Sequence, residues 1–144
     1  GGGRVHNYRP PRVTERPRIS GVVTGVIQSV AGDTSRGYHR IDGEGRYLVK
    51  LHFDQGLVAM PRVRMAQPHA GPGYGHHFPL RPGAEVVVAF LDGDPDRPII
   101  VGAVPNPTQR SPVTIAQANE PVDVHRIRTL SGVTIEISDG NRRA

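Results

Sequence analysis

Ala84-Glu85-Val86-Val87-Val88-Ala89-Phe90-Leu91 is followed by Asp92-Gly93-Asp94-Pro95-Asp96-Arg97-Pro98 and then by Ile99-Ile100-Val101-Gly102-Ala103-Val104. The first run is short, apolar and β-branched, which is typical of a strand with little water on either face. The middle run cannot continue that strand, because proline lacks the ladder donor and glycine and aspartate favour tight turns. The whole stretch predicts a hairpin of two buried strands around a stiff acidic loop.

Three earlier segments also carry strand patterns, and none shows a convincing helix period. They are Gly21–Val30, Arg46–Asp54 and Pro61–Gln67. The second alternates most clearly, and the residues on its apolar face are Tyr47, Val49, Leu51 and Phe53. In the third, Val63 and Met65 are expected inside and Arg62 and Arg64 outside. With the hairpin, these segments predict an all-β fold, a small five-stranded antiparallel barrel.

The region after the hairpin reads as a connector and one more strand. Residues 108–129 show little periodicity, whereas Val133-Thr134-Ile135-Glu136-Ile137-Ser138 alternates and stops at a turn signal. A lone strand with an apolar face is not stable by itself. We therefore expect it to pair with the barrel or with other copies of the chain.

Composition limits the classes of function. The 144 residues include no cysteine, so disulfides and thiolate metal sites are excluded. No segment approaches the ~20 apolar residues of a membrane helix, and the start, Gly1-Gly2-Gly3-Arg4, lacks the apolar core of a signal peptide. We expect no membrane anchor, and export, if any, by another route.

The net charge of +5 makes nucleic acid a candidate partner. A barrel that binds single strands stacks bases on exposed aromatic side chains over a basic groove. Aromatic residues make up 5% of the chain, with no Trp, and Tyr47 and Phe53 fall on the expected core face. The aromatic pattern argues against nucleic acid more strongly than the charge argues for it.

The sequence leads us to expect no catalytic, cofactor-binding or metal-binding site. Asp92, Asp94 and Asp96 alternate like the first ligands of a calcium loop, but the sixth position is Arg97 and the twelfth is Ala103. We interpret the aspartates as turn formers. The loop of residues 68–79 holds His69, His76 and His77, but no further ligand is close in sequence.

The run Glu85–Pro98 resembles the signature of the spike proteins of contractile injection machines. This family includes the VgrG proteins of type VI secretion and the baseplate spike proteins of contractile-tailed phages. Gly45–Asp54 resembles the second strand of the spike barrel, and Tyr74-Gly75 resembles an aromatic-glycine pair of the family. Gln55–Met60 is shorter than the loop common in type VI members, which leaves phage-derived machines open.

The resemblance implies a domain organisation. It places an extended linker from a hub-like region at 1–18, an oligonucleotide/oligosaccharide-binding (OB) barrel at 19–107, a connector at 108–129 and the start of a trimeric β-helix at 130–144. The chain would then be a fragment of a longer spike. The implied family signature loop is Asp92, Gly93, Asp94, Pro95, Asp96, Arg97 and Pro98, and the expected trimer interface is Val133, Ile135 and Ile137.

The function implied by the resemblance is structural. The chain would join hub to β-helical needle in a trimeric puncturing spike and would have no catalytic activity. Its partners would be two further copies, hub or baseplate and tube proteins, and a tip protein or effector. It would be cytoplasmic during assembly and then translocated or extracellular. The alternative is an OB-fold module that binds single-stranded nucleic acid.

Overall fold

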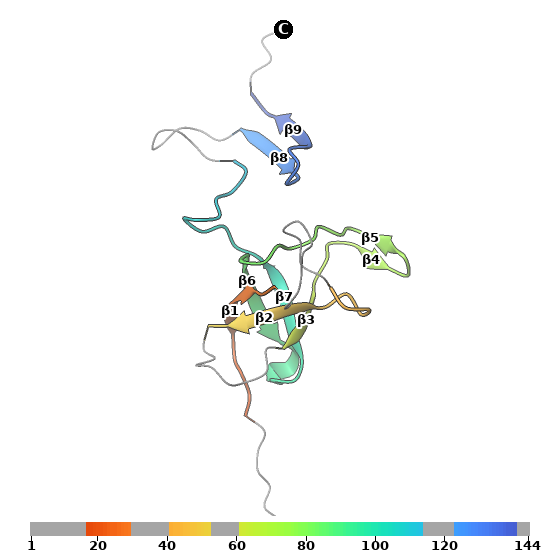
Figure 1. Ribbon diagram of the computed structural model, residues 1–144, viewed down its shortest axis with the longest axis vertical. Helices are drawn as coiled ribbons and strands as arrows, with labels where there is room; N and C mark the ends of the chain where they lie inside the picture. The colour runs from red at the N-terminus through yellow and green to blue at the C-terminus, as the bar shows by residue number, and fades with distance from the viewer. Residues whose placement is uncertain (1–16, 30–40, 53–60, 114–122, 141–144) are drawn as a thin grey trace, which may run out of the picture.

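The computed structural model describes residues 17–29, 41–52, 61–113 and 123–140, and its main feature is a closed barrel (Figure 1). The barrel strands are β1 (Val22–Ile27), β2 (Tyr47–Leu51), β3 (Arg62–Met65), β6 (Glu85–Phe90) and β7 (Pro98–Ala103). They close in the order β1-β2-β3-β7-β6. The predicted all-β class and five-stranded OB-like barrel are confirmed.

One strand pair departs from the antiparallel prediction. β3 and β7 run parallel, with Arg64 opposite Ile99 and Met65 opposite Ile100, whereas the other barrel pairs are antiparallel. The reason is parity: directions cannot alternate around a closed ring with an odd number of strands, so at least one neighbouring pair must be parallel. A fully antiparallel five-stranded closed barrel was therefore an impossible prediction.

The core consists of the inward-facing residues of all five strands. β2 and β6 alternate between buried and less buried positions, as a sheet with one packed face requires. The buried hydrophobic residues are Ile27, Tyr47, Val49, Leu51, Val63, Val86, Val88, Phe90 and Ile100. The inward assignments of Tyr47, Val49, Leu51 and Val63 are confirmed, and Phe53 lies outside the described residues.

The expectation that β6 and β7 would be buried on both faces is wrong for β7. Ile100 is completely buried, but its neighbour Val101 is 54% exposed. The outward positions of β6, such as Val87 and Ala89, are half-buried. The apolar runs therefore predicted the two strands correctly, but the outer face of β7 is less covered than they suggested.

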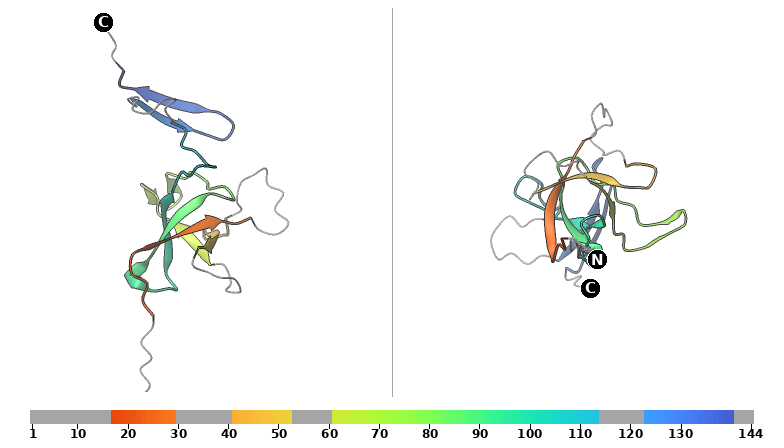
Figure 2. Two further views of the ribbon diagram at one scale, coloured as in Figure 1. Left: turned by 90° about the vertical axis from the view of Figure 1, so that its left-hand side faces the viewer. Right: turned by 90° about the horizontal axis from the view of Figure 1, so that it is seen from below.

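Residues 68–79 are more regular than the predicted irregular loop. β4 (Ala70–Gly71) and β5 (Tyr74–Gly75) form a small antiparallel hairpin. It extends to one side of the barrel in Figure 1 and in the right-hand view of Figure 2.

The C-terminal strand is not alone. β8 (Val124–Arg128) pairs antiparallel with β9 (Thr134–Ser138), with Ile127 opposite Ile135. The strand was expected to pair with the barrel or with other copies of the chain, whereas its ladder partner is β8, which lies within the expected connector at 108–129. This hairpin lies beyond the end of the barrel opposite to residues 17–20 (Figure 1). One hairpin of one chain does not make a β-helix, so the trimeric β-helix remains a prediction.

Helical structure is minimal in the described ranges. The 3₁₀ turn η1 (Leu91–Gly93) is the helical element there, and no helix in those ranges is long and apolar enough to cross a membrane.

Candidate functional site

The signature loop is a compact turn braced by its own backbone. Leu91 N–H donates to the Arg97 carbonyl at 2.9 Å, which closes the loop across the ends of β6 and β7. Within it, Asp94 N–H donates to the Leu91 carbonyl and Arg97 N–H to the Asp94 carbonyl, both at 3.0 Å. Gly93 has φ +71°, a conformation that glycine adopts without steric cost. The loop is thus preformed between two barrel strands.

The aspartates of the loop form turns, and Asp92 pairs with Arg97. Asp94 Oδ1 accepts from Asp96 N–H at 2.9 Å, a turn in which the side chain mimics backbone. Asp92 has φ 54°, and its carboxylate lies 3.1 Å from Arg97 Nη1. Both side chains of this pair are exposed, so its contribution to stability is small.

The loop also contacts the chain that enters the barrel. Ile19 N–H donates to the Gly93 carbonyl at 2.8 Å. A hollow of about 190 Å³ beside this bond is lined by Pro17, Arg18, Asp92, Asp94, Pro95 and Arg97. The acidic loop and the entering chain therefore form one continuous surface.

The histidines of the β4–β5 region lie on an exposed hairpin. The His69 ring is 5.4 Å from the Tyr74 ring and 6.0 Å from the His76 ring, centroid to centroid. Throughout residues 17–29, 41–52, 61–113 and 123–140, no three His, Asp or Glu side chains are placed to hold a metal ion. The His69 ring is tilted relative to the Tyr74 ring and meets the His76 ring edge-on.

The β8–β9 ribbon has one apolar face that the described chain does not cover. Cross-strand partners lie on the same face, so Ile127 and Ile135 share it, and Ile137 lies two residues further along β9. These side chains are 49%, 60% and 62% exposed, and Val133 before β9 is 66% exposed. Three of these four residues are the predicted trimer interface, and Ile127 was missed because β8 was not recognised as a strand.

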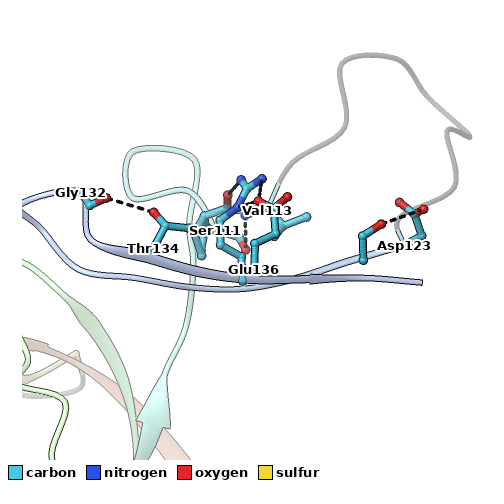
Figure 3. A network of polar contacts seen from close by, with 9 residues as sticks. Ser111, Val113, Asp123, Gly132, Thr134 and Glu136 are labelled. Atoms are coloured by element: carbon cyan, nitrogen blue, oxygen red, sulfur yellow. Dashed lines mark hydrogen bonds and ion pairs between the residues drawn. The ribbon is translucent and has the colours of Figure 1, made fainter. Parts of the chain in front are cut away.

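The opposite face of the ribbon is polar and fixed to the connector (Figure 3). Arg126 contacts Glu136 Oε2 through Nε at 2.9 Å and Nη2 at 2.7 Å, and its Nη1 donates to the Pro112 carbonyl at 2.7 Å. Thr134 Oγ1 donates to the Gly132 carbonyl on the same ribbon. The polar face has partners within the chain, whereas the isoleucines of the apolar face are left exposed by the described residues.

A groove separates the ribbon from the barrel. Its volume is about 510 Å³, and it is lined by Phe78, Pro79, Arg81, Arg110, Pro112, Arg128, Thr129 and Leu130. Among the described residues of this lining, arginine is the charged type and no carboxylate is present.

The outer face of β2 and β3 is basic. Lys50, Arg62 and Arg64 are exposed there. Tyr47 is buried, 1% exposed, and its hydroxyl accepts a hydrogen bond from Leu80 N–H at 3.2 Å. The face has the positive charge of a surface that binds nucleic acid. The Tyr47 ring, however, points into the core and is not available to stack on a base.

A carboxylate supports the turn before β2. Asp42 Oδ1 accepts from Arg46 N–H at 2.9 Å and from Glu44 N–H at 3.0 Å, and Oδ2 lies 2.8 Å from Arg46 Nε. The hydrogen bond from the Arg46 backbone is the largest cause that lowers the pKa of Asp42 below its usual value. The same side-chain pairing raises the pKa of Arg46.

Comparison with known proteins places this barrel in a family. Residues 39–104 match the type VI secretion system/phage-baseplate injector OB domain. This range includes β2 to β7 and the signature loop.

Individual relatives are spike proteins. The chain is 34% identical over 115 residues to the type VI secretion system spike protein VgrG5 of Pseudomonas aeruginosa, covering 77% of this chain and 14% of that protein. VgrG1b of the same organism is 37% identical over 109 residues, 73% of this chain and 14% of that protein. VgrG3 of Vibrio cholerae is 34% identical over 110 residues, 72% of this chain and 10% of that protein.

The chain thus spans about one-seventh or less of the length of these curated relatives. The match nevertheless includes the residues on which the sequence-based resemblance depended, from the second barrel strand to the acidic loop. The chain therefore belongs to the family of the type VI secretion system and phage-baseplate injector OB domain.

Proposed function

We propose that the chain is a structural part of a trimeric puncturing spike and that its barrel joins a hub-like region to a β-helical needle. The closed barrel and the similarity to type VI spike proteins support this role. The chain would act without catalysis of its own, as a rigid spacer between the two regions.

The observation that carries the proposal is the uncovered apolar face of the β8–β9 ribbon. An isolated two-stranded hairpin is at best marginally stable in water. Ile127, Ile135 and Ile137 are about half to two-thirds exposed, while Arg126 ties the polar face to the connector. Packing the same face of three copies around an axis would bury these side chains, and a closed cyclic arrangement avoids open-ended association.

Burying the apolar face in a trimer would release a sizeable free energy, but the cost of association opposes it. Burying the exposed part of each isoleucine contributes roughly 1 to 2 kcal/mol, multiplied over three chains. Association also costs translational and rotational freedom and side-chain ordering. We therefore expect a trimer in the full-length spike, and a weak trimer or a monomer for these 144 residues alone.

The test is the mass in solution of the full-length spike with Ile135→Asp. A carboxylate on the apolar face should dissociate or weaken the trimer. Thr134→Asp is the matched control, because Thr134 precedes Ile135 on β9 and lies on the polar face, so it should leave the trimer intact. A trimer that survives Ile135→Asp unaltered would mean that the barrel or the hub holds the assembly.

The partners and location follow from the same role. We infer hub or baseplate and tube proteins on the side of the entering chain, and a tip protein or effector beyond the needle. A spike of this kind assembles inside the producing cell and ends translocated or in an extracellular particle. The named relatives favour type VI secretion over a phage tail as the machine.

A second candidate is a single-strand-binding module, favoured by the exposed Lys50, Arg62 and Arg64 on the β2–β3 face. It predicts oligonucleotide binding that weakens steeply with salt and is lost in Arg62→Ala/Arg64→Ala. Salt-insensitive or absent binding of a labelled single-stranded oligonucleotide would remove this candidate and leave the structural role.

A further inference from the structure

We propose that the signature loop is a latch that holds the chain entering the barrel at residues 17–19 and so fixes the direction from which that chain arrives. The proposal concerns contacts within this chain and does not depend on the spike role. In this proposal the Asp92–Pro98 run does more than turn the chain between β6 and β7.

The first observation is a backbone bond beyond the sheet. β1 and β6 pair from Val22 opposite Ala89 to Val26 opposite Glu85. The bond from Ile19 N–H to the Gly93 carbonyl, at 2.8 Å, lies past the end of this ladder. The entering chain therefore stays attached after regular strand pairing has ended, and Figure 2 shows residues 17–20 running past the η1 turn.

The second observation is the space at Gly93. A Cβ atom there would lie 3.3 Å from the Ile19 carbonyl oxygen and 3.4 Å from Arg18 Cβ. Glycine thus serves two needs at this position, the positive φ of the turn and the close approach of the entering backbone.

The third observation is that both partners of the bond are held independently. The backbone bonds from Leu91 N–H to the Arg97 carbonyl and from Arg97 N–H to the Asp94 carbonyl fix the loop. The Ile19 side chain packs against the barrel core. The Gly93 carbonyl and the Ile19 N–H are therefore each held in place before they bond, which is what we mean by a latch. A force applied to the chain before residue 19 would then act on the β6–β7 loop as well as on β1.

The experiment compares Gly93→Ala with Gly45→Ala by hydrogen exchange at the Ile19 amide. Gly45 has φ +73°, close to that of Gly93, but a Cβ there would meet nothing within 4 Å. Both variants therefore carry the same backbone strain, and Gly93→Ala alone pushes against the entering chain. We expect Ile19 exchange to accelerate about tenfold in Gly93→Ala, the loss of one backbone hydrogen bond, and to change little in Gly45→Ala.

The Ile27 amide, which donates to the Ala84 carbonyl inside the barrel, reports on the barrel itself. Faster exchange at Ile19 with unchanged exchange at Ile27 supports the latch, as does faster trypsin cleavage after Arg18. Equal acceleration at both amides, or equal effects of the two glycine substitutions, overturns it. If Gly93→Ala does not fold, the wild-type chain still tests the latch: protection of the Ile19 amide above the rate of an unbonded amide supports it, and exchange at the unprotected rate overturns it.

Discussion

Tyr47 and Leu80, 33 residues apart in sequence, are joined by a hydrogen bond in which Leu80 N–H donates to the Tyr47 hydroxyl at 3.2 Å. Tyr47 is 1% exposed, so its hydroxyl reaches through the core to the segment that precedes β6. The bond ties the start of β2 to the return of the chain after the β4–β5 hairpin.

Tyr47→Phe tests this bond. The substitution keeps the ring in the core and removes the acceptor, so we expect the free energy of unfolding to fall by about 0.5 to 1.5 kcal/mol. Urea unfolding followed by circular dichroism measures the change. Tyr74→Phe is the control, because Tyr74 is 60% exposed and should be neutral. Equal effects of the two substitutions would show that the buried bond adds no stability.

Gly25 on β1 is predicted to reject alanine for a steric reason. A Cβ there would lie 2.8 Å from Val49 Cγ1 and 2.9 Å from the Lys50 carbonyl oxygen, atoms of the paired strand β2. Because backbone cannot yield easily, Gly25→Ala should cost about 1 to 3 kcal/mol of stability.

Gly102 on β7 is the matched control for Gly25. A Cβ there would meet nothing within 4 Å, so Gly102→Ala should be neutral or slightly stabilising. Thermal unfolding of both variants would separate the close contact from the general effect of adding a methyl group to a strand glycine. A Gly102→Ala protein as unstable as Gly25→Ala would contradict this account.

Ile100 and Val101 provide a test of the two faces of β7. Ile100 is completely buried and Val101 is 54% exposed. Ile100→Ala should lower the free energy of unfolding by about 2 to 5 kcal/mol, through lost burial and the cavity left behind. Val101→Ala should change it by less than about 0.5 kcal/mol. A large cost for Val101→Ala in the full-length protein would instead show that a partner covers the outer face.

The hydrophobic pattern predicted the barrel strands because alternation and β-branched runs report directly which side chains meet the core. Tyr47, Val49, Leu51 and Val63 were placed correctly on this basis. The pattern did not predict exposure at Val101, since an apolar residue on an outer face looks the same in sequence whether or not something covers it. Strand parity requires a parallel pair such as β3–β7, and parity is a property of the closed ring and of no single residue.

β8 was missed because the alternation of Val124-His125-Arg126-Ile127-Arg128 is broken. Arginine and histidine occupy both faces, and Arg126 is held by Glu136 across the ribbon and by the Pro112 carbonyl, contacts between residues 10 and 14 positions apart. Such partners are invisible to a local period. The contacts of the acidic loop were also only partly predictable: its turns follow from Asp, Gly and Pro, whereas its contact with Ile19 depends on the folded barrel.

Asp42 should make stability depend on pH in the acid range. Its pKa is lowered in the folded chain, chiefly by the Arg46 backbone hydrogen bond, from an ordinary value of 3.8. A carboxyl group whose pKa is lower in the folded state than in the unfolded state contributes its full stabilisation of the fold at pH values above the unfolded pKa. That stabilisation begins to decline as the pH falls to about 4, near the unfolded pKa, and it is lost completely only when the pH falls below the lowered folded pKa.

The measurement is the free energy of unfolding of the wild-type chain and Asp42→Asn between pH 2 and pH 7. The difference between them should be largest above pH 4 and should shrink as the solution is acidified. Glu44→Gln is the control, because the Glu44 carboxylate contacts the Arg46 guanidinium at 3.3 Å in an exposed setting, without the two backbone hydrogen bonds that Asp42 accepts. A difference that stays constant over this range would mean that the Asp42 hydrogen bonds do not favour the charged carboxylate.

Arg126 should determine how firmly the ribbon is held to the connector. It contacts Glu136 through two nitrogens and donates a third bond to the Pro112 carbonyl, so Arg126→Gln removes the link between residues 111–113 and β9. Because the ion pair is partly exposed, the expected loss is about 0.5 to 1 kcal/mol, read as faster exchange of the β8–β9 ladder amides with barrel amides unchanged. Arg128→Gln, two residues along the same face of β8, is the matched control and should leave the exchange of those amides unaltered. If both substitutions accelerate ladder exchange equally, cross-strand pairing alone holds the ribbon, and the bond to Pro112 contributes nothing measurable to its position.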